Sequence, residues 1–473
     1  MTSEDKPPTT KFENVASLMI SCLGLLLIVT TVNLACASCQ LNSTRVTEIA
    51  DQLETLAPID DPSLVAASPQ SLLARAGFKY EVYNITTDDG YILQLIHIIN
   101  PLVSRNNLRR LPVLMQCPLL VTSGIFLAPS LDETQPVAYP SNNQPLSDNP
   151  REWTSSNRSL ALFLANNGFD MWLGCNRGCD ANNMGLDETK ASPRARANYY
   201  SYSIDDFARF DLSANVDGVL NKTGAKKLLQ VGFSQGTLIS FMRLATTDIA
   251  NDTFSSKIHT FVAMAPVAGR MSLSPLQLPL RAVVAAIYPV LYPIFLNNPV
   301  LTPELSRLVI TVTLSLYENL PGGEAIIQLI GSLLGGPSLN MQFDRVIVGQ
   351  VPLNGHGNQL AHFAQLIMIN QAAKFDYGPI ENLQRYNNSL VTPKYDFTKI
   401  RLNQSIALFA GTNDALAPLD NVGYLRSVLQ NNVFYQKTIE GYNHFDFSIA
   451  RDNYQQVNKP ILDLLIDRLA KVQ

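Results

Sequence analysis

The sequence predicts an α/β fold with a mostly parallel central sheet and an inserted helical cap. Short apolar segments typical of buried strands alternate with helical patterns through the first part of the chain, which is the order of a βαβ architecture. A serine between two nearby glycines follows one of these strands, at the point where a helical pattern begins. The alternation then stops over residues 269–376, where long apolar stretches interrupted by proline and glycine take its place.

The composition fits a large apolar core or contact with lipid. Hydrophobic residues make up 46% of the 473 residues, charged residues make up only 16%, and the net charge is −4. Because nucleic-acid binding relies on a basic excess, we expect no nucleic-acid partner. The five histidines and six cysteines are scattered rather than spaced as metal ligands, so we expect no metal and no other cofactor.

The N-terminal segment predicts entry into the secretory pathway. Residues 15–37 carry no charge and follow two lysines, which is the order of regions in a signal peptide. Ala35 and Ala37 place small residues where a signal peptidase cleaves, so we expect residues 1–37 to be removed before Ser38. The apolar run is also close to the about 20 residues that span a bilayer. A lumen-facing membrane anchor is therefore the alternative to a secreted or lysosomal protein.

Two weaker signals agree with an oxidising, lumenal environment. A bridge between Cys175 and Cys179 is possible there, although three cysteines in the body of the chain cannot all pair with one another. Asn-x-Ser/Thr acceptors of a glycoprotein occur at Asn42, Asn84, Asn157, Asn221, Asn251, Asn387 and Asn403.

Residues 38–268 are predicted to form the first part of the core. Alternating apolar and polar residues around an Asp-Gly pair at 89–90 predict a hairpin over residues 78–100. Apolar runs predict further strands at residues 111–121, 169–173, 227–231 and 257–264. Helical patterns occupy residues 159–167, 204–220 and 236–247.

Residues 269–376 are predicted to form the cap, and residues 377–473 the second part of the core. The apolar stretches of the cap are residues 282–296 and 308–334. The first is short for a membrane span and contains two prolines, so we expect cap helices rather than a second span. Strand patterns return at residues 405–410 and 433–437, and a final helix is expected over residues 455–469.

The serine at position 234 lies in a G-x-S-x-G pattern. The pattern runs from Gly232 to Gly236, with an apolar strand before it and a helical pattern after it. Strand, sharp turn and helix in this order form the nucleophile elbow of the α/β-hydrolase fold, in which the serine hydroxyl is exposed for attack. We therefore predict that Ser234 is a nucleophile.

A serine nucleophile needs a base and an acid, which follow it in that fold in the order serine, acid, histidine. His444 comes just after the last predicted strand, and Asp414 follows the strand at residues 405–410. Asp414 would fix the tautomer of His444 and stabilise the imidazolium. The rival histidines are His259, His356 and His362, and the rival acids are Asp420 and Asp446.

An oxyanion hole requires two backbone N–H groups. The first is expected from Gln235, the residue after the nucleophile. The second should come from the loop after the strand at residues 111–121, where the glycine at position 124 favours the N–H of Ile125. Leu119 is the alternative donor, although it follows a proline and has no glycine beside it.

Several motifs together resemble the acid lipase family, which includes gastric and lysosomal acid lipases and related steryl ester hydrolases. The resemblance extends from about residue 78 to the C-terminus. It rests on Thr87-Asp88-Asp89-Gly90-Tyr91, Trp172-Leu173-Gly174-x-x-Arg177-Gly178, Phe210-Asp211-Leu212, Gly232-x-Ser234-Gln235-Gly236-Thr237, Gly411-x-Asn413-Asp414-x-Leu416-Ala417 and Tyr442-Asn443-His444-x-Asp446-Phe447.

The resemblance implies a lipase that hydrolyses neutral lipid esters, either triacylglycerols or steryl esters, at a lipid–water interface. It also implies that the cap carries a lid. The sequence departs from the family at two positions near the site: Ser123-Gly124-Ile125 stands where the family has His-Gly-Leu, and Phe233 where histidine is frequent. A non-catalytic lipid-binding protein on the same fold, or an esterase of small soluble esters, are the alternative functions.

Overall fold

The computed structural model describes residues 60–129, 158–179, 185–267, 303–319, 321–350 and 355–471, apart from positions 66, 105 and 107. Residue 131, a few residues between 44 and 51, and others between 282 and 299 are also described. The segment at residues 1–37, with its expected cleavage or anchor, lies outside these ranges. Within the ranges, no helix has both the length and the apolar character of a membrane span.

The described strands form one nine-stranded sheet in the order β1-β2-β4-β3-β6-β7-β8-β9, with β5 paired to β2. All pairs from β4 to β9 are parallel, whereas β1, β2 and β5 pair antiparallel at one edge. The strands are β1 (Lys79–Thr86), β2 (Tyr91–Ile99), β3 (Val113–Gln116), β4 (Met171–Gly174), β5 (Gly185–Leu186), β6 (Leu228–Phe233), β7 (Ile258–Met264), β8 (Ile406–Gly411) and β9 (Val433–Ile439). The predicted α/β fold with a mostly parallel sheet is confirmed.

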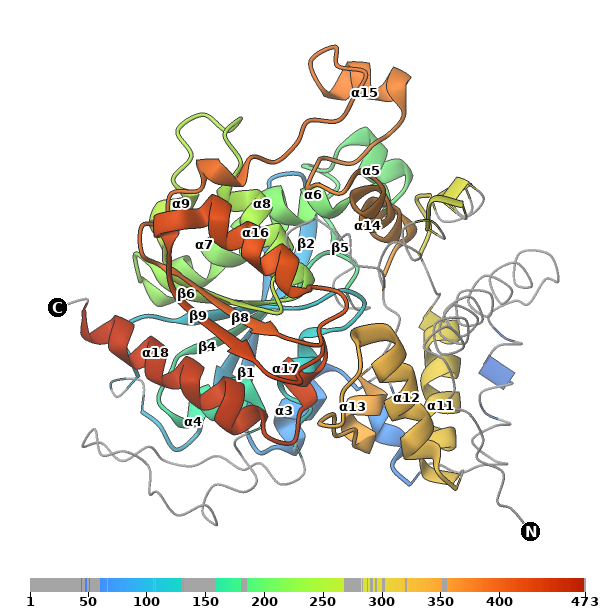
Figure 1. Cartoon of the computed structure of the whole chain (residues 1–473), viewed down its shortest axis with the longest axis vertical. Helices are drawn as coiled ribbons and strands as arrows, with labels where there is room; N and C mark the ends of the chain where they lie inside the picture. The colour runs from blue at the N-terminus through green and yellow to red at the C-terminus, as the bar shows by residue number, and fades with distance from the viewer. Residues whose placement is uncertain are drawn as a thin grey trace, which may run out of the picture.

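Helices cover both faces of the sheet (Figure 1). On one face lie α3 (Pro69–Arg75), α4 (Leu160–Asn166) and α18 (Lys459–Ala470). On the other lie α6 (Ile204–Asp206), a π-helical turn at Phe207–Asp211, α7 (Leu212–Thr223), α8 (Gln235–Leu244) and α16 (Leu419–Leu429). Short helices α5 (Pro193–Ala197), α9 (Phe254–Lys257) and α17 (Asp446–Ile449) complete this part of the molecule.

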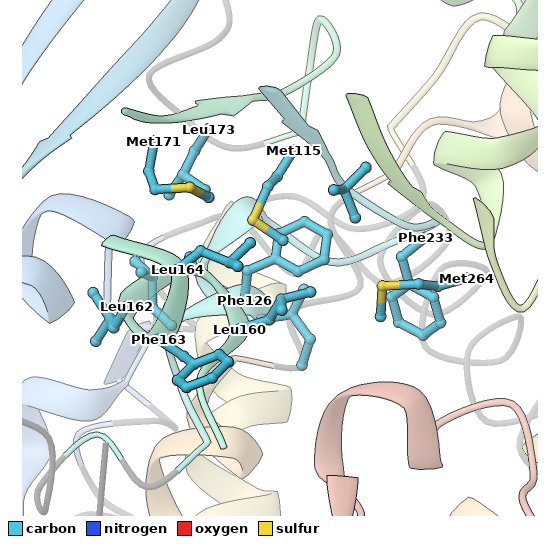
Figure 2. Packing of buried hydrophobic residues seen from close by; sticks show 14 of the residues in the cluster. Met115, Phe126, Leu160, Leu162, Phe163, Leu164, Met171, Leu173, Phe233 and Met264 are labelled. Atoms are coloured by element: carbon cyan, nitrogen blue, oxygen red, sulfur yellow. The ribbon is translucent and has the colours of Figure 1, made fainter. Parts of the chain in front are cut away.

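Strand residues alternate between two hydrophobic clusters, as the period of two in a strand requires. In β3, Val113 and Met115 pack into one cluster and Leu114 into the other. Figure 2 shows the first cluster, in which Met115 lies close to residues of β4 and α4. Both faces of the central strands are buried, which explains their mainly apolar sequences.

Among the described residues between β7 and β8, five α-helices have defined bounds. They are α11 (Pro303–Asn319), α12 (Gly323–Gly335), α13 (Arg345–Gly349), α14 (Gly357–Ile369) and α15 (Pro379–Arg385). The apolar stretch at residues 308–334 therefore forms two helices, which separate at Gly322 where φ is +82°. In Figure 1, α11, α12 and α13 pack together beside the sheet, next to α17.

A buried cluster of charges around Arg177 holds three segments together. Arg177 follows β4, and its guanidinium donates to Asp211 at 2.8 Å and to Asp89 at 2.9 Å. Asp89 lies in the turn of the β1–β2 hairpin, and Asp211 ends the π-helical turn before α7. The guanidinium also lies 3.7 Å from the ring centroid of Tyr91. The buried guanidinium is thus paired with two carboxylates, as a buried charge requires.

We expect Arg177→Met to lower the free energy of unfolding by about 3–5 kcal/mol, because it leaves the fully buried Asp211 without its partner. Urea denaturation monitored by fluorescence measures the loss. Arg209→Met is the matched control, since the Arg209–Asp248 pair is largely exposed and should contribute at most about 1 kcal/mol. Equal losses in the two variants would contradict a structural role for the cluster.

Candidate active site

The turn at Ser234 connects β6 to α8 and has a backbone conformation that side-chain-bearing residues rarely adopt. The φ and ψ angles of Ser234 are 53° and −115°. A Cβ on Gly232 would approach the carbonyl oxygen of Gly236 to 2.9 Å, and a Cβ on Gly236 would collide with the carbonyl oxygen of Gln116. Glycine is therefore required on both sides, and the tight turn projects the serine side chain from the carboxyl end of β6.

The structure brings Ser234, His444 and Asp414 into one hydrogen-bonded chain. His444 Nε2 lies 2.8 Å from Ser234 Oγ, and His444 Nδ1 lies 2.9 Å from Asp414 Oδ1. All three residues are buried, with 7%, 3% and 3% of their surface exposed respectively. The carboxylate accepts from Nδ1, which leaves Nε2 as the nitrogen that can take a proton from the serine.

The acid is itself held in place by its own loop. Asp414 Oδ1 accepts hydrogen bonds from the backbone N–H groups of Leu416, at 2.9 Å, and Ala417, at 2.7 Å. The imidazole of His444 stacks near the ring of Phe233, with 5.6 Å between centroids. Phe233 thus forms one wall of the site.

The rival residues lie in other environments. His259 contacts Thr260, and His362 Nε2 lies 2.9 Å from the carbonyl oxygen of Ala373. His356 is buried against the rings of Tyr202 and Phe207. Asp446 accepts from the N–H of Asn443 at 2.7 Å, and Asp420 lies in the first turn of α16. The two ring nitrogens of His444 lie instead against Asp414 and Ser234.

The loop after β3 corrects the expectation for Ile125. The N–H of Ile125 donates to the carbonyl oxygen of Thr122 at 3.3 Å, inside a 3₁₀ helix at Ser123–Phe126. Gly124 serves this helix as well, because its N–H donates to Thr122 Oγ1 at 3.1 Å. The Ile125 N–H is thus used within the turn, and the glycine marks the turn rather than an oxyanion loop.

The segment directly after β3 borders the nucleophile turn instead. Cys117, Pro118 and Leu120 line a small cavity together with Gln235, the first residue of α8. Leu120 has a φ of +62°, so the chain makes its tight turn at a residue that gives no glycine signal. Gln235 Oε1 accepts from Gln359 Nε2 of α14 at 2.6 Å, a contact for which the sequence offers no pattern.

Two cysteines, Cys117 and Cys179, line this cavity. Cys175 and Cys179 form a disulfide, the bridge that the sequence allowed. The buried Cys117 places its Sγ 3.2 Å from Cys175 Sγ. Within the described ranges, no three histidine, cysteine or acidic side chains are grouped so that they could hold a metal ion.

Burial changes the titration of two acids near the site. The pKa of Asp446, two residues after His444, is raised to about 6 by its removal from water, although the N–H of Asn443 partly opposes this. Burial also raises the pKa of Asp206 to about 6, against the attraction of Arg177. Both carboxyl groups therefore favour their protonated form in the folded chain at mildly acidic pH.

The sheet order and the strand–turn–helix at Ser234 define an α/β-hydrolase. A family model described as a partial alpha/beta-hydrolase lipase region matches residues 69–130. The chain is 30% identical to gastric triacylglycerol lipase of Bos taurus over 83% of this chain and 89% of the relative. It is also 28% identical to lipase member K of Homo sapiens, over 83% and 89% of the two chains.

The chain belongs to the family of gastric triacylglycerol lipase and its relatives, as the motifs predicted. The human gastric lipase gives the same result, with 30% identity over 82% of this chain and 88% of the relative. The enzyme is accordingly a lipase, a carboxylic ester hydrolase.

We expect the Asp446 carboxyl to contribute stability that rises as the pH falls from about 6 to about 4, whereas the buried His356, whose pKa is lowered by burial, acts in the opposite direction. The folded chain binds the Asp446 proton more tightly than the unfolded chain, whose carboxyl has a pKa of 3.8. This stabilisation is complete when the pH is below 3.8, the pKa in the unfolded chain, and is lost as the pH rises through the folded-state pKa of about 6. The Asp446→Asn variant should show a smaller change of the urea unfolding midpoint with pH. Above pH 7 it should unfold at a higher urea concentration than wild type.

Urea unfolding midpoints between pH 4 and pH 8 measure this dependence. Asp463→Asn is the control, because Asp463 is exposed beside Lys459 and its variant should follow the wild-type profile. A profile of Asp446→Asn parallel to wild type would show that Asp446 does not titrate as stated.

Proposed function

We propose that Ser234, His444 and Asp414 act as nucleophile, base and acid in the hydrolysis of neutral lipid esters. The observation that supports this most is the continuous chain of hydrogen bonds from Ser234 Oγ through His444 to Asp414, at 2.8 and 2.9 Å. Such a chain activates a serine that is otherwise a weak nucleophile.

The proposed reaction is acyl transfer in two steps. Ser234 Oγ attacks the ester carbonyl carbon while His444 Nε2 takes its proton, and the alcohol leaves with that proton. Water, deprotonated by His444, then releases the acid from the acyl-enzyme. The N–H of Gln235 and, in place of Ile125, the N–H of Leu119 would hold the oxyanion, since both belong to the two segments that meet at the turn.

An apolar surface on α12 supports action at a lipid–water interface. Residues 325–335 contain no charged side chain. Ile326, Leu329, Ile330 and Leu334 are 40%, 59%, 36% and 38% exposed. The opposite side of the helix is buried through Ile327 and glycines. Exposed apolar area of this kind marks an interaction surface, and we propose that it contacts the lipid phase beside the site.

The names of the relatives and the motifs of the sequence support a substrate class and a compartment. The names point to triacylglycerols, and the resemblance to steryl ester hydrolases keeps steryl esters as the other candidate. We propose a secreted or lysosomal enzyme with a signal segment at residues 1–37 and a cap at residues 269–376.

We expect Ser234→Ala to abolish hydrolysis of emulsified triolein and cholesteryl oleate, because no other group replaces the nucleophile. Fatty acid release at pH 5 and pH 7 measures this, and labelling by a fluorophosphonate should disappear with it. A labelled wild type that cleaves only short soluble esters would favour the small-ester esterase. A folded wild type that is neither labelled nor active would favour the lipid-binding protein.

We expect Leu329→Asp to reduce activity on emulsified triolein by at least about 10-fold, because a carboxylate on the α12 surface must be desolvated to enter lipid. Activity on soluble p-nitrophenyl butyrate should stay within about two-fold of wild type. Ile380→Asp is the matched control, since Ile380 is an exposed apolar residue of α15 rather than of α12. Equal losses from both variants on triolein would refute a specific role for α12.

A further inference from the structure

The carbonyl oxygen of Gly335, the last residue of α12, accepts two backbone hydrogen bonds from the proposed triad loops. The N–H of His444 donates to it at 3.0 Å, and so does the N–H of Ala415, also at 3.0 Å. Ala415 directly follows Asp414. One acceptor at the end of a cap helix is therefore shared by the base itself and by the neighbour of the acid.

The next two carbonyl groups continue the same contact. The carbonyl oxygen of Gly336 accepts from Asn443 Nδ2 at 2.8 Å, and that of Pro337 accepts from Asn413 Nδ2 at 3.0 Å. Asn443 precedes the base and Asn413 precedes the acid. Carbonyl groups at a helix C-terminus have no partner within their own helix, so this end of α12 can accept bonds from both loops.

Neither glycine can carry a side chain at this contact. A Cβ on Gly335 would lie 2.6 Å from a ring carbon of Phe445, the residue after the base. Gly336 has a φ of +107°, and a Cβ there would collide with the carbonyl oxygen of Asn413. The helix end thus meets the backbone of the acid loop at Gly336 and the ring of Phe445 in the base loop at Gly335.

We propose that residues 335–337 position the base and the acid relative to each other, and so attach the apolar surface of α12 to the reactive centre. The acid loop follows β8 and the base loop follows β9, and the hydrogen bonds from Ala415 and His444 tie both to one atom. This inference rests on the proposed roles of Ser234, Asp414 and His444.

The effect on the reaction follows from the geometry of proton transfer. His444 Nε2 is within 2.8 Å of Ser234 Oγ, and a displacement of about 1 Å in such a contact can cost about 100-fold in rate. A side chain at position 335 pushes against Phe445 and displaces the adjoining base. The loss should therefore appear in kcat rather than in KM for a small ester that does not need the α12 surface.

The test uses the full chain and p-nitrophenyl butyrate. Gly335→Ala should lower kcat and the rate of fluorophosphonate labelling by about 10- to 100-fold, with KM within about two-fold. Phe445→Ala in the same chain should restore part of kcat, because it removes the ring that the new methyl group meets. Gly423→Ala is the matched glycine control, since a Cβ there meets nothing within 4 Å.

A folded Gly335→Ala enzyme with wild-type kcat and labelling rate would overturn the proposal. So would a loss of kcat that Phe445→Ala does not relieve. If Gly335→Ala does not fold, Asn413→Ala decides, because it removes the hydrogen bond to Pro337, and with it only the long 3.5 Å bond from Thr412, and should lower kcat by several-fold with an altered pH profile. If the wild type is labelled and cleaves the soluble ester but not lipid emulsions, the proposed lipid substrate is wrong. The test of residues 335–337 remains valid in that case, because it uses the soluble ester.

Discussion

No side chain fits between the end of β3 and the turn that follows β6, and much of the site depends on this exclusion. β3 and β6 are parallel neighbours, with Gln116 opposite Gly232. The carbonyl oxygen of Gln116 then occupies the space that a Cβ on Gly236 would need. Because the two backbones meet so closely, Ser234 takes its unusual conformation and the segment after β3 lies against Gln235. Larger residues at either glycine would separate the strands or flatten the turn, and the serine side chain would lose its position at the carboxyl end of β6.

The fold and the three triad candidates could be predicted because each depends on local pattern and chain order. The carboxyl ends of parallel strands meet at one edge of a sheet, so Asp414 and His444, each placed after a strand, had to lie near Ser234. The second oxyanion donor depends on something less visible. A glycine after β3 predicts the place where this loop comes close to the turn at Ser234. In the structure, however, Gly124 belongs to a 3₁₀ helix, and the tight turn is made at Leu120. A leucine with positive φ is enforced by its surroundings, which the sequence alone does not reveal.

The proposed role of α12 in positioning the triad loops could not be predicted from the sequence either, for a related reason. Its apolar stretch predicted a helix, and the structure has one, but its contact with the triad loops is made by backbone carbonyl groups. Every residue has such a group, so no residue type marks the few that matter. Only the pair Gly335 and Gly336 hints at a close approach, and glycines are also common at helix ends for conformational reasons alone. A glycine needed for close packing can be told from a glycine that ends a helix only when the residues that it faces are known. Here these residues are Phe445 and Asn413.

The position of the insertion explains how one helix can reach both loops. The chain leaves β7 at the same sheet edge where β6, β8 and β9 end, so a segment inserted before β8 emerges beside the serine, acid and base loops. Movement of the C-terminus of α12 away from the core would break the hydrogen bonds of Ala415 and His444 and release the residue proposed as the base. The end of α12 is therefore better suited to a fixed support, which keeps the apolar surface of α12 beside Ser234.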